Sequence, residues 1–259
     1  MEQPRKLETE PHIVVENLTM AFGSFVLQRD LNFTVNRGDV FIIMGGSGCG
    51  KSTLLRHMVG LQRPASGKVL YDGTVSFWDA TPDERNLIMR RIGILYQSGA
   101  LWSSMTLAEN VALPLREYTR LREPDIRELC SLKLALVGLS GFEDYYPSEI
   151  SGGMKKRAGL ARAMALDPDI LFLDEPSAGL DPISSRLLDD LILELRASLG
   201  STVVVVTHEL ASIFAIGNNS VFIDAEAKTM IARGDPKVLL AESDNPTVRR
   251  FLTRGAEKG

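Results

Sequence analysis

The sequence predicts an α/β fold with a mostly parallel β-sheet, and three observations carry this prediction. The apolar runs Val40–Met44, 170–173 and Thr202–Val206 have the composition of strands buried on both faces. Segments with helical periodicity follow such runs, above all the one that begins after Pro182 and stops at Gly200. Strands that alternate with helices along a chain favour a parallel sheet covered by helices.

The remaining elements follow from turn and helix signals in chain order. Before Val40 the pattern is one of short strands, over 13–15 and 31–35, with a turn at 36–39. The same pattern of short strands and turns continues over 67–97, where the last strand is expected at 92–96. Residues from about 104 to 165 read as mostly helical. Three prolines punctuate this stretch and predict several short helices, at Pro114, Pro124 and Pro147.

The helix after Pro182 and the chain end complete the prediction. One apolar face is expected on that helix, formed by Ile183, Leu187, Leu188, Leu191 and Leu195. Beyond residue 244 a short helix is expected over 247–252, followed by a polar end. Residues 1–11 are polar, contain two prolines and predict a loose arm.

Composition excludes several classes of protein. The chain has 259 residues and a formal net charge of −4, which provides no basic field for nucleic acid. No apolar run approaches the ~18 residues that a membrane span needs, and the first residues lack the apolar stretch of a secretory signal. The two cysteines, Cys49 and Cys130, show no metal-like spacing. A reduced, cytosolic chain is expected.

The most informative stretch is residues 45–52, which read Gly-Gly-Ser-Gly-Cys-Gly-Lys-Ser. This fits the pattern of a glycine, four residues and Gly-Lys-Ser/Thr that binds nucleotide phosphates between a strand and a helix. Glycines let successive N–H groups turn inward around an anion, and the helix N-terminus adds unpaired donors. Lys51 would reach the β- and γ-phosphates, and Ser52 would bind Mg²⁺. The alternative, a glycine-rich turn that binds nothing, gives no reason for Lys-Ser in this register.

Two carboxylates end the apolar run at 170–173. Parallel strands deliver such residues to the ligand-binding edge of a sheet. Asp174 would hold the Mg²⁺ shell through water, and Glu175 would orient and polarise an attacking water. The alternative is an acidic turn at a strand end.

Three further features are consistent with a nucleotide site when they are considered together with the phosphate loop. Residues 151–155, Ser-Gly-Gly-Met-Lys, open a predicted helix that Ser151 can cap, and the glycines allow a phosphate close to the backbone. Taken alone, this segment would be a linker or a cap. His208 follows a buried strand and could donate to the γ-phosphate. Gln97 ends another strand, where its amide could reach Mg²⁺ or the attacking water.

These motifs, in this order, resemble those of the ATP-binding-cassette (ABC) ATPases over residues 12–240. The resemblance implies a P-loop NTPase core, an N-terminal antiparallel β subdomain and a helical subdomain at about 100–165, with 1–11 as an arm and 241–259 as a tail. It implies two copies that sandwich two ATP molecules, the helix opened by Ser151 in one copy capping the γ-phosphate held by the other.

The resemblance also assigns site residues. Lys51, Glu175 and His208 are the expected catalytic residues, and Mg²⁺ is expected at Ser52, Gln97 and Asp174. ATP is expected to contact Phe22, Gly45, Gly46, Ser47, Gly48, Cys49, Gly50, Lys51, Ser52, Thr53, Gln97, Ser151, Gly152, Gly153 and Asp181. Phe22 would stack on adenine; the alternative is a hydrophobic residue in a β-turn.

Some positions depart from the family pattern. Phe22 stands where tyrosine is usual, Ile150 where leucine is usual, and Met154 where glutamine is usual. Methionine cannot make the polar contacts of glutamine, so Met154 is left out of the expected site. Cys49 within the loop reads as a small residue, with a redox-sensitive thiol as the alternative.

Four segments resemble the ATPase subunit of Mla/Mce-type phospholipid transporters of Gram-negative bacteria. They are residues 96–102, 110–117, 150–158 and 172–176. The resemblance implies lipid traffic between inner and outer membranes, and a peripheral place on the cytoplasmic face of the inner membrane. The implied partners are two permeases, a periplasmic MCE lipid-binding ring and a small STAS-type protein. The apolar residues Ala100, Leu101 and Trp102 would receive the permease or pack within the subdomain. The basic cluster at 155–157 is interpreted as a solvated helix face.

Other functions stay open. A DNA-repair cassette would carry a long coiled coil between the loop and Ser151, but only 100 residues separate Lys51 from Ser151. Translation cassettes usually come as two per chain. A cluster-assembly ATPase and a transporter of another cargo, such as lipoprotein or amino acid, remain as alternatives.

Overall fold

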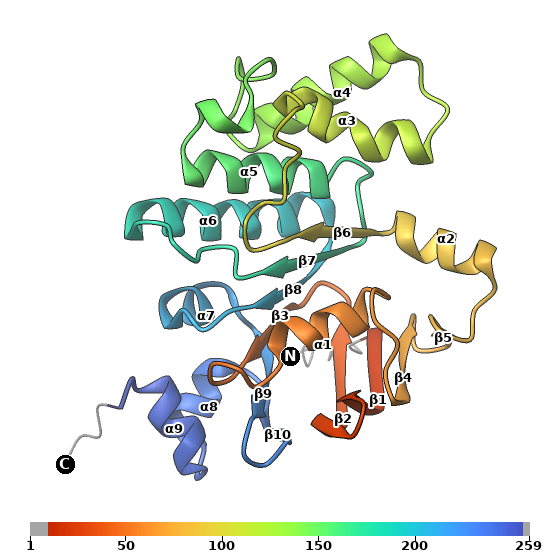
Figure 1. Ribbon diagram of the computed structural model, residues 1–259. Helices are drawn as coiled ribbons and strands as arrows, with labels where there is room; N and C mark the ends of the chain where they lie inside the picture. The colour runs from red at the N-terminus through yellow and green to blue at the C-terminus, as the bar shows by residue number, and fades with distance from the viewer. Residues whose placement is uncertain (1–9, 256–259) are drawn as a thin grey trace, which may run out of the picture.

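The computed structural model describes residues 10–255. Most of the arm expected over 1–11 and the last residues of the expected tail, 256–259, lie outside the described residues. Within the described part, two β-sheets pack around one helix and a helical subdomain extends from one end (Figure 1). No helix in residues 10–255 is long and apolar enough to cross a membrane.

The central sheet has six strands in the order β10-β9-β3-β8-β7-β6. Its strands are β3 (Val40–Met44), β6 (Ile92–Leu95), β7 (Ile170–Asp174), β8 (Thr202–Val206), β9 (Asn219–Asp224) and β10 (Thr229–Arg233). Pairing is parallel from β6 through β7, β8 and β3 to β9, and only β10 runs antiparallel. The predicted mostly parallel sheet is therefore confirmed, and the carboxyl ends of its parallel strands share one edge.

The N-terminal sheet is antiparallel, as predicted, in the order β2-β1-β4-β5. It consists of β1 (Pro11–Phe22), β2 (Phe25–Asn36), β4 (Ser66–Tyr71) and β5 (Val75–Ser76). Helix α1 (Lys51–Met58) lies between this sheet and the central one (Figure 1). A separate helix, α2 (Pro82–Arg90), precedes β6; Thr81 caps its start in a capping box with Glu84.

Two apolar clusters cover the two faces of the central sheet because alternate residues of each strand point to opposite sides. Ile42 and Leu171 belong to the cluster beneath the helical subdomain. Phe41 and Phe172, one position away in their strands, belong to the cluster shared with α1 and the antiparallel sheet. Burial on both faces is the physical reason that these strands read as unbroken apolar runs.

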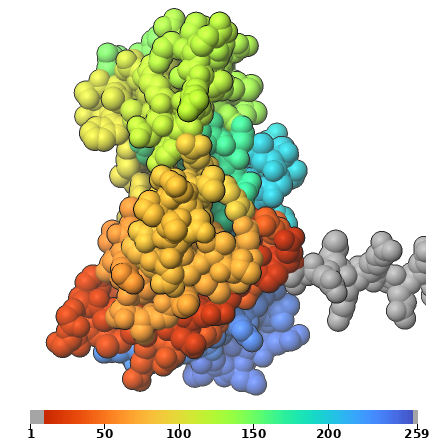
Figure 2. Space-filling model, turned by 90° about the vertical axis from the view of Figure 1, so that its right-hand side faces the viewer, coloured from red at the N-terminus to blue at the C-terminus, as the bar shows by residue number. Residues whose placement is uncertain are grey.

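The helical subdomain contains α3 (Leu107–Tyr118), α4 (Glu123–Leu136), a 3₁₀ turn (Pro147–Glu149) and α5 (Gly152–Ala163). Figure 2 shows it as a lobe set apart from the rest of the molecule. Pro124 and Pro147 stand at helix starts, where a missing N–H costs nothing. Pro114, however, lies inside α3. The prediction of a break there was wrong, because the helix buries Val111 and Leu115 around the proline.

Helix α6 (Pro182–Leu199) corrects a second expectation. Its buried stripe is Leu188, Ile192 and Leu195, and Leu191 is only partly buried. Ile183 is 75% exposed and Leu187 62% exposed. The sequence periodicity therefore identified the helix and three residues of its inner side, Leu188, Leu191 and Leu195, but wrongly included Ile183 and Leu187.

The C-terminal part holds α7 (Leu210–Ile216), α8 (Pro236–Glu242) and α9 (Pro246–Leu252). Helix α9 confirms the short helix expected at 247–252, and it is part of the packed structure. Its Val248 and Leu252 are buried in the cluster beneath the helical subdomain, and Phe251 meets Phe222 of β9 edge to face at 5.0 Å between ring centroids.

We expect Leu252→Ala to lower the free energy of unfolding by about 2–4 kcal/mol, because truncating a buried leucine leaves a cavity. Leu240→Ala in α8 is the matched control, since Leu240 is 38% exposed, and it should cost much less. Urea unfolding followed by circular dichroism measures both. Equal stability of wild type and Leu252→Ala would show that α9 does not belong to the cooperative fold.

Candidate functional site

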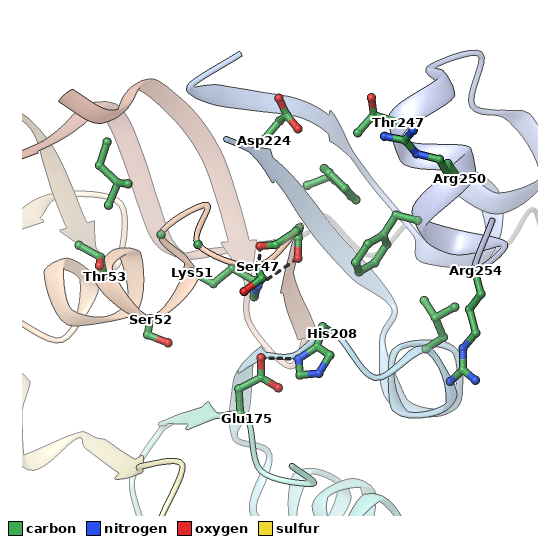
Figure 3. Close-up of a pocket in the computed structure, with 18 of the residues that line it drawn as sticks. Ser47, Lys51, Ser52, Thr53, Glu175, His208, Asp224, Thr247, Arg250 and Arg254 are labelled. Carbon is green, nitrogen blue, oxygen red and sulfur yellow. Dashed lines mark hydrogen bonds and ion pairs between the residues drawn. The ribbon is translucent and has the colours of Figure 1, made fainter. Parts of the chain in front are cut away.

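The shared edge of the parallel strands gathers the predicted motifs around one cavity of about 1060 Å³. Gly45 to Thr53 follow β3, Gln97 follows β6, Glu175 follows β7 and His208 follows β8. Figure 3 shows Lys51 and Ser47 facing the Glu175–His208 pair across this space. Of the residues expected to contact the phosphates, the lining includes Gly45, Gly46, Ser47, Gly48, Gly50, Lys51, Ser52, Thr53, Gln97, Glu175 and His208.

Glycine is required at two positions of the loop. Gly45 has φ 151°, and a Cβ there would lie 2.2 Å from the carbonyl oxygen of Ile223. Gly50 has φ 99°, caps α1 in the left-handed conformation, and a Cβ would meet Leu27 at 2.8 Å. Lys51, Ser52 and Thr53, in the first turn of α1, line the cavity, and the first N–H groups of a helix have no intrahelical partner and favour anions.

Lys51 lies over the loop that it follows. Its Nζ donates to the carbonyl oxygens of Gly45 and Gly46, both at 3.0 Å, and the side chain is 9% exposed. A lysine ammonium held at the glycine loop beside the cavity is suited to the terminal phosphates of a nucleotide.

Ser52 and Asp174 form a second contact across the site. The Ser52 hydroxyl donates to Asp174 Oδ1 at 2.9 Å. Burial raises the pKa of Asp174, and the hydrogen bond from Ser52 opposes that shift. This hydroxyl and carboxylate are hard oxygen ligands of the kind that Mg²⁺ uses together with substrate phosphates, so the donor set fits that ion. In residues 10–255 no three His, Cys, Asp or Glu side chains converge into a cage built by protein alone.

Glu175 and His208 are hydrogen-bonded. Glu175 Oε1 accepts from His208 Nδ1 at 2.8 Å. The other oxygen, Glu175 Oε2, is buried and has no partner among the described residues. The backbone of Glu175 is left-handed, with φ 48°, which is uncommon for a residue with a side chain. An ionised carboxylate with one free oxygen beside a histidine can take a proton from a water molecule.

Cys49 is buried within the loop. Burial raises the pKa of its thiol, so the reactive thiolate is disfavoured. Gln28 fixes the loop there, donating to the carbonyl oxygens of Cys49 and Asp224, both at 2.8 Å. The structure supports the interpretation of Cys49 as a small packing residue.

The remaining predicted residues do not line the cavity. Phe22 lies beside the β1–β2 hairpin turn with its ring 53% exposed. Ser151 caps α5, accepting from the Met154 N–H at 3.3 Å. Asp181 caps α6, accepting from the N–H groups of Ile183 and Ser184 at 3.0 Å. Met154 is partly buried against the apolar cluster of the subdomain, which gives a packing reason for methionine there.

Gly152 and Gly153 have no structural need inside the chain. A Cβ on Gly152 would meet nothing within 4 Å, and one on Gly153 would make ordinary contacts at 3.7 Å or more. Neither has the positive φ that favours glycine. No contact among the described residues therefore requires glycine at either of these first two positions of α5.

Sequence reasoning missed several residues of the site. The cavity wall opposite the loop comes from α7, β9 and α9 and includes Leu210, Phe222, Asp224, Thr247, Arg250, Phe251 and Arg254. Lys156 was expected on a solvated face but is only 6% exposed. Its Nζ donates to the carbonyl oxygens of Glu175 and Ala178. No signal in the sequence distinguishes it from Lys155.

The fold and this site define the class of protein. A family model described as ABC transporter matches residues 28–178, and the chain belongs to that family. The expectation of an ABC ATPase cassette is thereby confirmed.

Curated relatives narrow the comparison. The intermembrane phospholipid transport system ATP-binding protein MlaF of Haemophilus influenzae is 42% identical over 232 residues, which are 90% of this chain and 87% of that protein. MlaF of Escherichia coli K12 is 40% identical over 238 residues. The probable ribonucleotide transport ATP-binding protein mkl of Mycobacterium tuberculosis is 42% identical over 240 residues. These are 93% of this chain but only 66% of mkl.

Solved structures agree with the fold. The dimeric structure of the bacterial ABC transporter cassette MJ0796 has a TM-score of 0.78 and 29% identity, covering 86% of this chain and 98% of that one. A post-hydrolysis dimer of the same cassette, bound to ADP and Pi, has a TM-score of 0.77. The structure of cbiO1 from Clostridium perfringens has a TM-score of 0.80 and 29% identity, covering 91% of this chain and 92% of that one.

We expect the folded protein to keep its ATP turnover after iodoacetamide treatment at neutral pH, because both cysteines are buried. Mass spectrometry should find Cys49 labelled only after unfolding in urea, which provides the control. Loss of turnover in step with labelling of Cys49 in the folded protein would restore the redox interpretation.

Proposed function

We propose that this chain binds and hydrolyses ATP to drive an ABC transporter that moves phospholipid between the inner and outer membranes of a Gram-negative bacterium. The observation that carries the hydrolytic part is the convergence of Lys51, Ser52, Asp174, Glu175 and His208 on one cavity edge. Asp174 contributes through its bond to Ser52. The phospholipid cargo rests on the relatives named MlaF.

The residues divide the chemistry among them. The N–H groups of the loop and the Lys51 ammonium hold the β- and γ-phosphates and neutralise their charge. Glu175 orients the attacking water through its free carboxylate oxygen. His208, held by that same carboxylate, donates from its exposed side to the γ-phosphate. Phe22, exposed beside its hairpin turn, offers a ring face to adenine.

Magnesium fits the remaining donors. Ser52, Gln97 and Asp174 are the residues that would hold it, Asp174 through water. Bound there with the nucleotide, Mg²⁺ would neutralise charge that develops on the phosphate oxygens. Asp174 accepts from the Ser52 hydroxyl at 2.9 Å and would, with Mg²⁺ bound, accept from the metal's water shell.

A second copy completes the site. Ser151, Gly152 and Gly153 lie outside the cavity of their own chain, yet they form a capped helix start with open space in front of it. Such a start binds anions readily. We assign it to the γ-phosphate bound by the second copy, with Asp181 at the same interface. The dimeric cassettes among the similar structures support this arrangement.

The segment after Gln97 is suited to a permease. Trp102 is 61% exposed, yet its backbone is rigidly held: Asn110, fully buried, accepts from its N–H at 2.7 Å and donates to its carbonyl oxygen. Arg162 donates to the carbonyl oxygens of Gly99 and Ala100. An exposed indole on a fixed loop is a good anchor for a partner helix.

The assembly follows from this proposal. The chain would sit at the cytoplasmic face of the inner membrane and bind two permeases, a periplasmic MCE ring and a small STAS-type protein. Ribonucleotide is a second candidate cargo, favoured by the name of mkl at the same 42% identity. Identification of the small molecule that co-purifies with the complex distinguishes phospholipid from ribonucleotide as the cargo.

We expect Glu175→Gln to bind ATP and dimerise but to hydrolyse it about 10²–10⁴-fold more slowly, because the general base is lost. Phosphate release, a fluorescent ATP analogue and size-exclusion chromatography with ATP measure the three properties. Lys51→Ala should instead lose affinity for ATP.

Glu128→Gln is the matched control, since Glu128 is exposed on α4 and does not line the cavity. Rapid turnover by Glu175→Gln would refute its role. Unchanged nucleotide binding by Lys51→Ala would contradict the assignment of the loop.

We expect Trp102→Ala to reduce recovery of an integral membrane partner from detergent-solubilised membranes by about tenfold or more, as for a central aromatic anchor. ATP turnover of the isolated chain should not change. Leu87→Ala, which removes another exposed side chain from α2, is the control. Lipid analysis of the wild-type complex should find phospholipid. Equal recovery with Trp102→Ala would place the permease elsewhere, and co-purification with no membrane protein would favour the cluster-assembly alternative.

A further inference from the structure

Lys156 is a buried lysine on α5, only 6% exposed. Lysine is rarely buried unless it is paired, and among residues 10–255 Lys156 forms no ion pair within 4.0 Å. Its Nζ donates instead to two main-chain carbonyl oxygens, that of Glu175 at 3.0 Å and that of Ala178 at 2.7 Å. A buried cation that neutralises no carboxylate directly therefore needs another purpose.

The carbonyl that Lys156 holds belongs to the strained residue of the site. Glu175 has φ 48°, and its main chain is fixed on both sides. Its N–H donates to the carbonyl oxygen of Val206 at 2.8 Å, and its own carbonyl oxygen also accepts from the Ala178 N–H at 3.2 Å. Conformations of this kind persist only where surrounding contacts hold them.

These contacts have different origins. Val206 belongs to the central sheet and Ala178 to the loop after β7, whereas Lys156 belongs to α5, the helix that Ser151 caps. Lys156 is thus a direct polar link from the helical subdomain to the main chain of Glu175. Burial lowers the pKa of Lys156, and the nearby charge of Glu175 opposes that shift.

We propose that Lys156 is a positioning residue that ties the main chain of Glu175 and of the loop at 177–181 to α5. Glu175 then comes into line with the attacking water when the N-terminus of α5 docks on ATP in the second copy. The inference rests on the proposed role of Glu175 and adds a means by which that residue is aligned. A purely structural role would instead lower stability without a specific effect on kcat.

Three variants of the full chain test the proposal. Lys156→Met keeps the length of the side chain but removes its donors, and Lys156→Arg keeps donors and charge. Lys155→Met, at the next position of the same helix, is the matched control because Lys155 is partly exposed. Steady-state phosphate release gives kcat and KM for ATP, and thermal unfolding gives Tm.

We expect Lys156→Met to lower kcat by about 10–100-fold, because a small misplacement of a catalytic group has costs of that order. The KM for ATP should stay within about twofold, since ground-state binding is not touched. Lys156→Arg should recover most of the lost kcat, and Lys155→Met should match wild type.

Any one of three results would overturn the proposal. These are an unchanged kcat in Lys156→Met, an equal loss of kcat in Lys155→Met, and a kcat of Lys156→Arg as low as that of Lys156→Met. If Lys156→Met does not fold, Lys156→Gln, with a donor on a shorter chain, decides: a reduced kcat at constant KM supports the proposal, and wild-type kcat overturns it. Full turnover by Glu175→Gln would instead refute the proposed function. Loss of turnover in Glu175→Gln with normal turnover in Lys156→Met would refute only this inference.

Discussion

The parallel pairing of the central strands is the constraint on which the site depends. Parallel strands end together, so β3, β6, β7 and β8 release their loops at one edge. The register is specific: Asp174 pairs with Val206, and the next residue, Glu175, donates its N–H to the Val206 carbonyl oxygen. This pairing places Glu175 beside His208, two residues beyond Val206. The Glu175–His208 contact is therefore a consequence of sheet register, and a slip of one residue would turn each side chain to the opposite face.

Burial on both faces of this sheet determines what surrounds the site. One face meets α1 and the antiparallel sheet, and the other meets the helical subdomain and α9. Helix α1 is held from both sides, which fixes the glycine loop at its start. The subdomain touches the core mainly through α5, whose Gly159 lets it approach closely, since a Cβ there would lie 3.0 Å from the carbonyl oxygen of Gly99. Helix α5 therefore contacts both the segment at 99–100, through Arg162 and Gly159, and the loop after β7, through Lys156.

Local patterns predicted the features that local physics determines. The loop at 45–52 needs glycine for its backbone, the buried strands need apolar residues on both faces, and Ser151 satisfies a free N–H group at a helix start. These requirements leave a trace in the sequence. The features that were missed depend on packing between distant segments. Pro114 is tolerated because α3 is packed around it. Lys156 lies on the side of α5 that faces the core, whereas its neighbour Lys155 is partly exposed. Helix α9, which forms part of the cavity wall, lies far along the chain from the glycine loop at 45–52, so no local sequence motif predicts its place in the site.

The geometry of one chain leaves a site that is organised but incomplete. Glu175 Oε2 is buried without a partner, and Lys51 bonds to carbonyl oxygens of its own loop. The anion-binding start of α5 stands outside the cavity, with glycines that nothing in its own chain requires. The proposed binding of a nucleotide between two copies would supply their partners: phosphate for Lys51 and the start of α5, and the attacking water for Glu175 Oε2. Because Lys156 joins α5 to the Glu175 main chain, the proposed capping of the phosphate in one copy would also bear on the carboxylate in the other. Under this proposal, hydrolysis at the two sites would be coupled through the protein itself, because ATP held by a single copy would lack the contact that aligns the water.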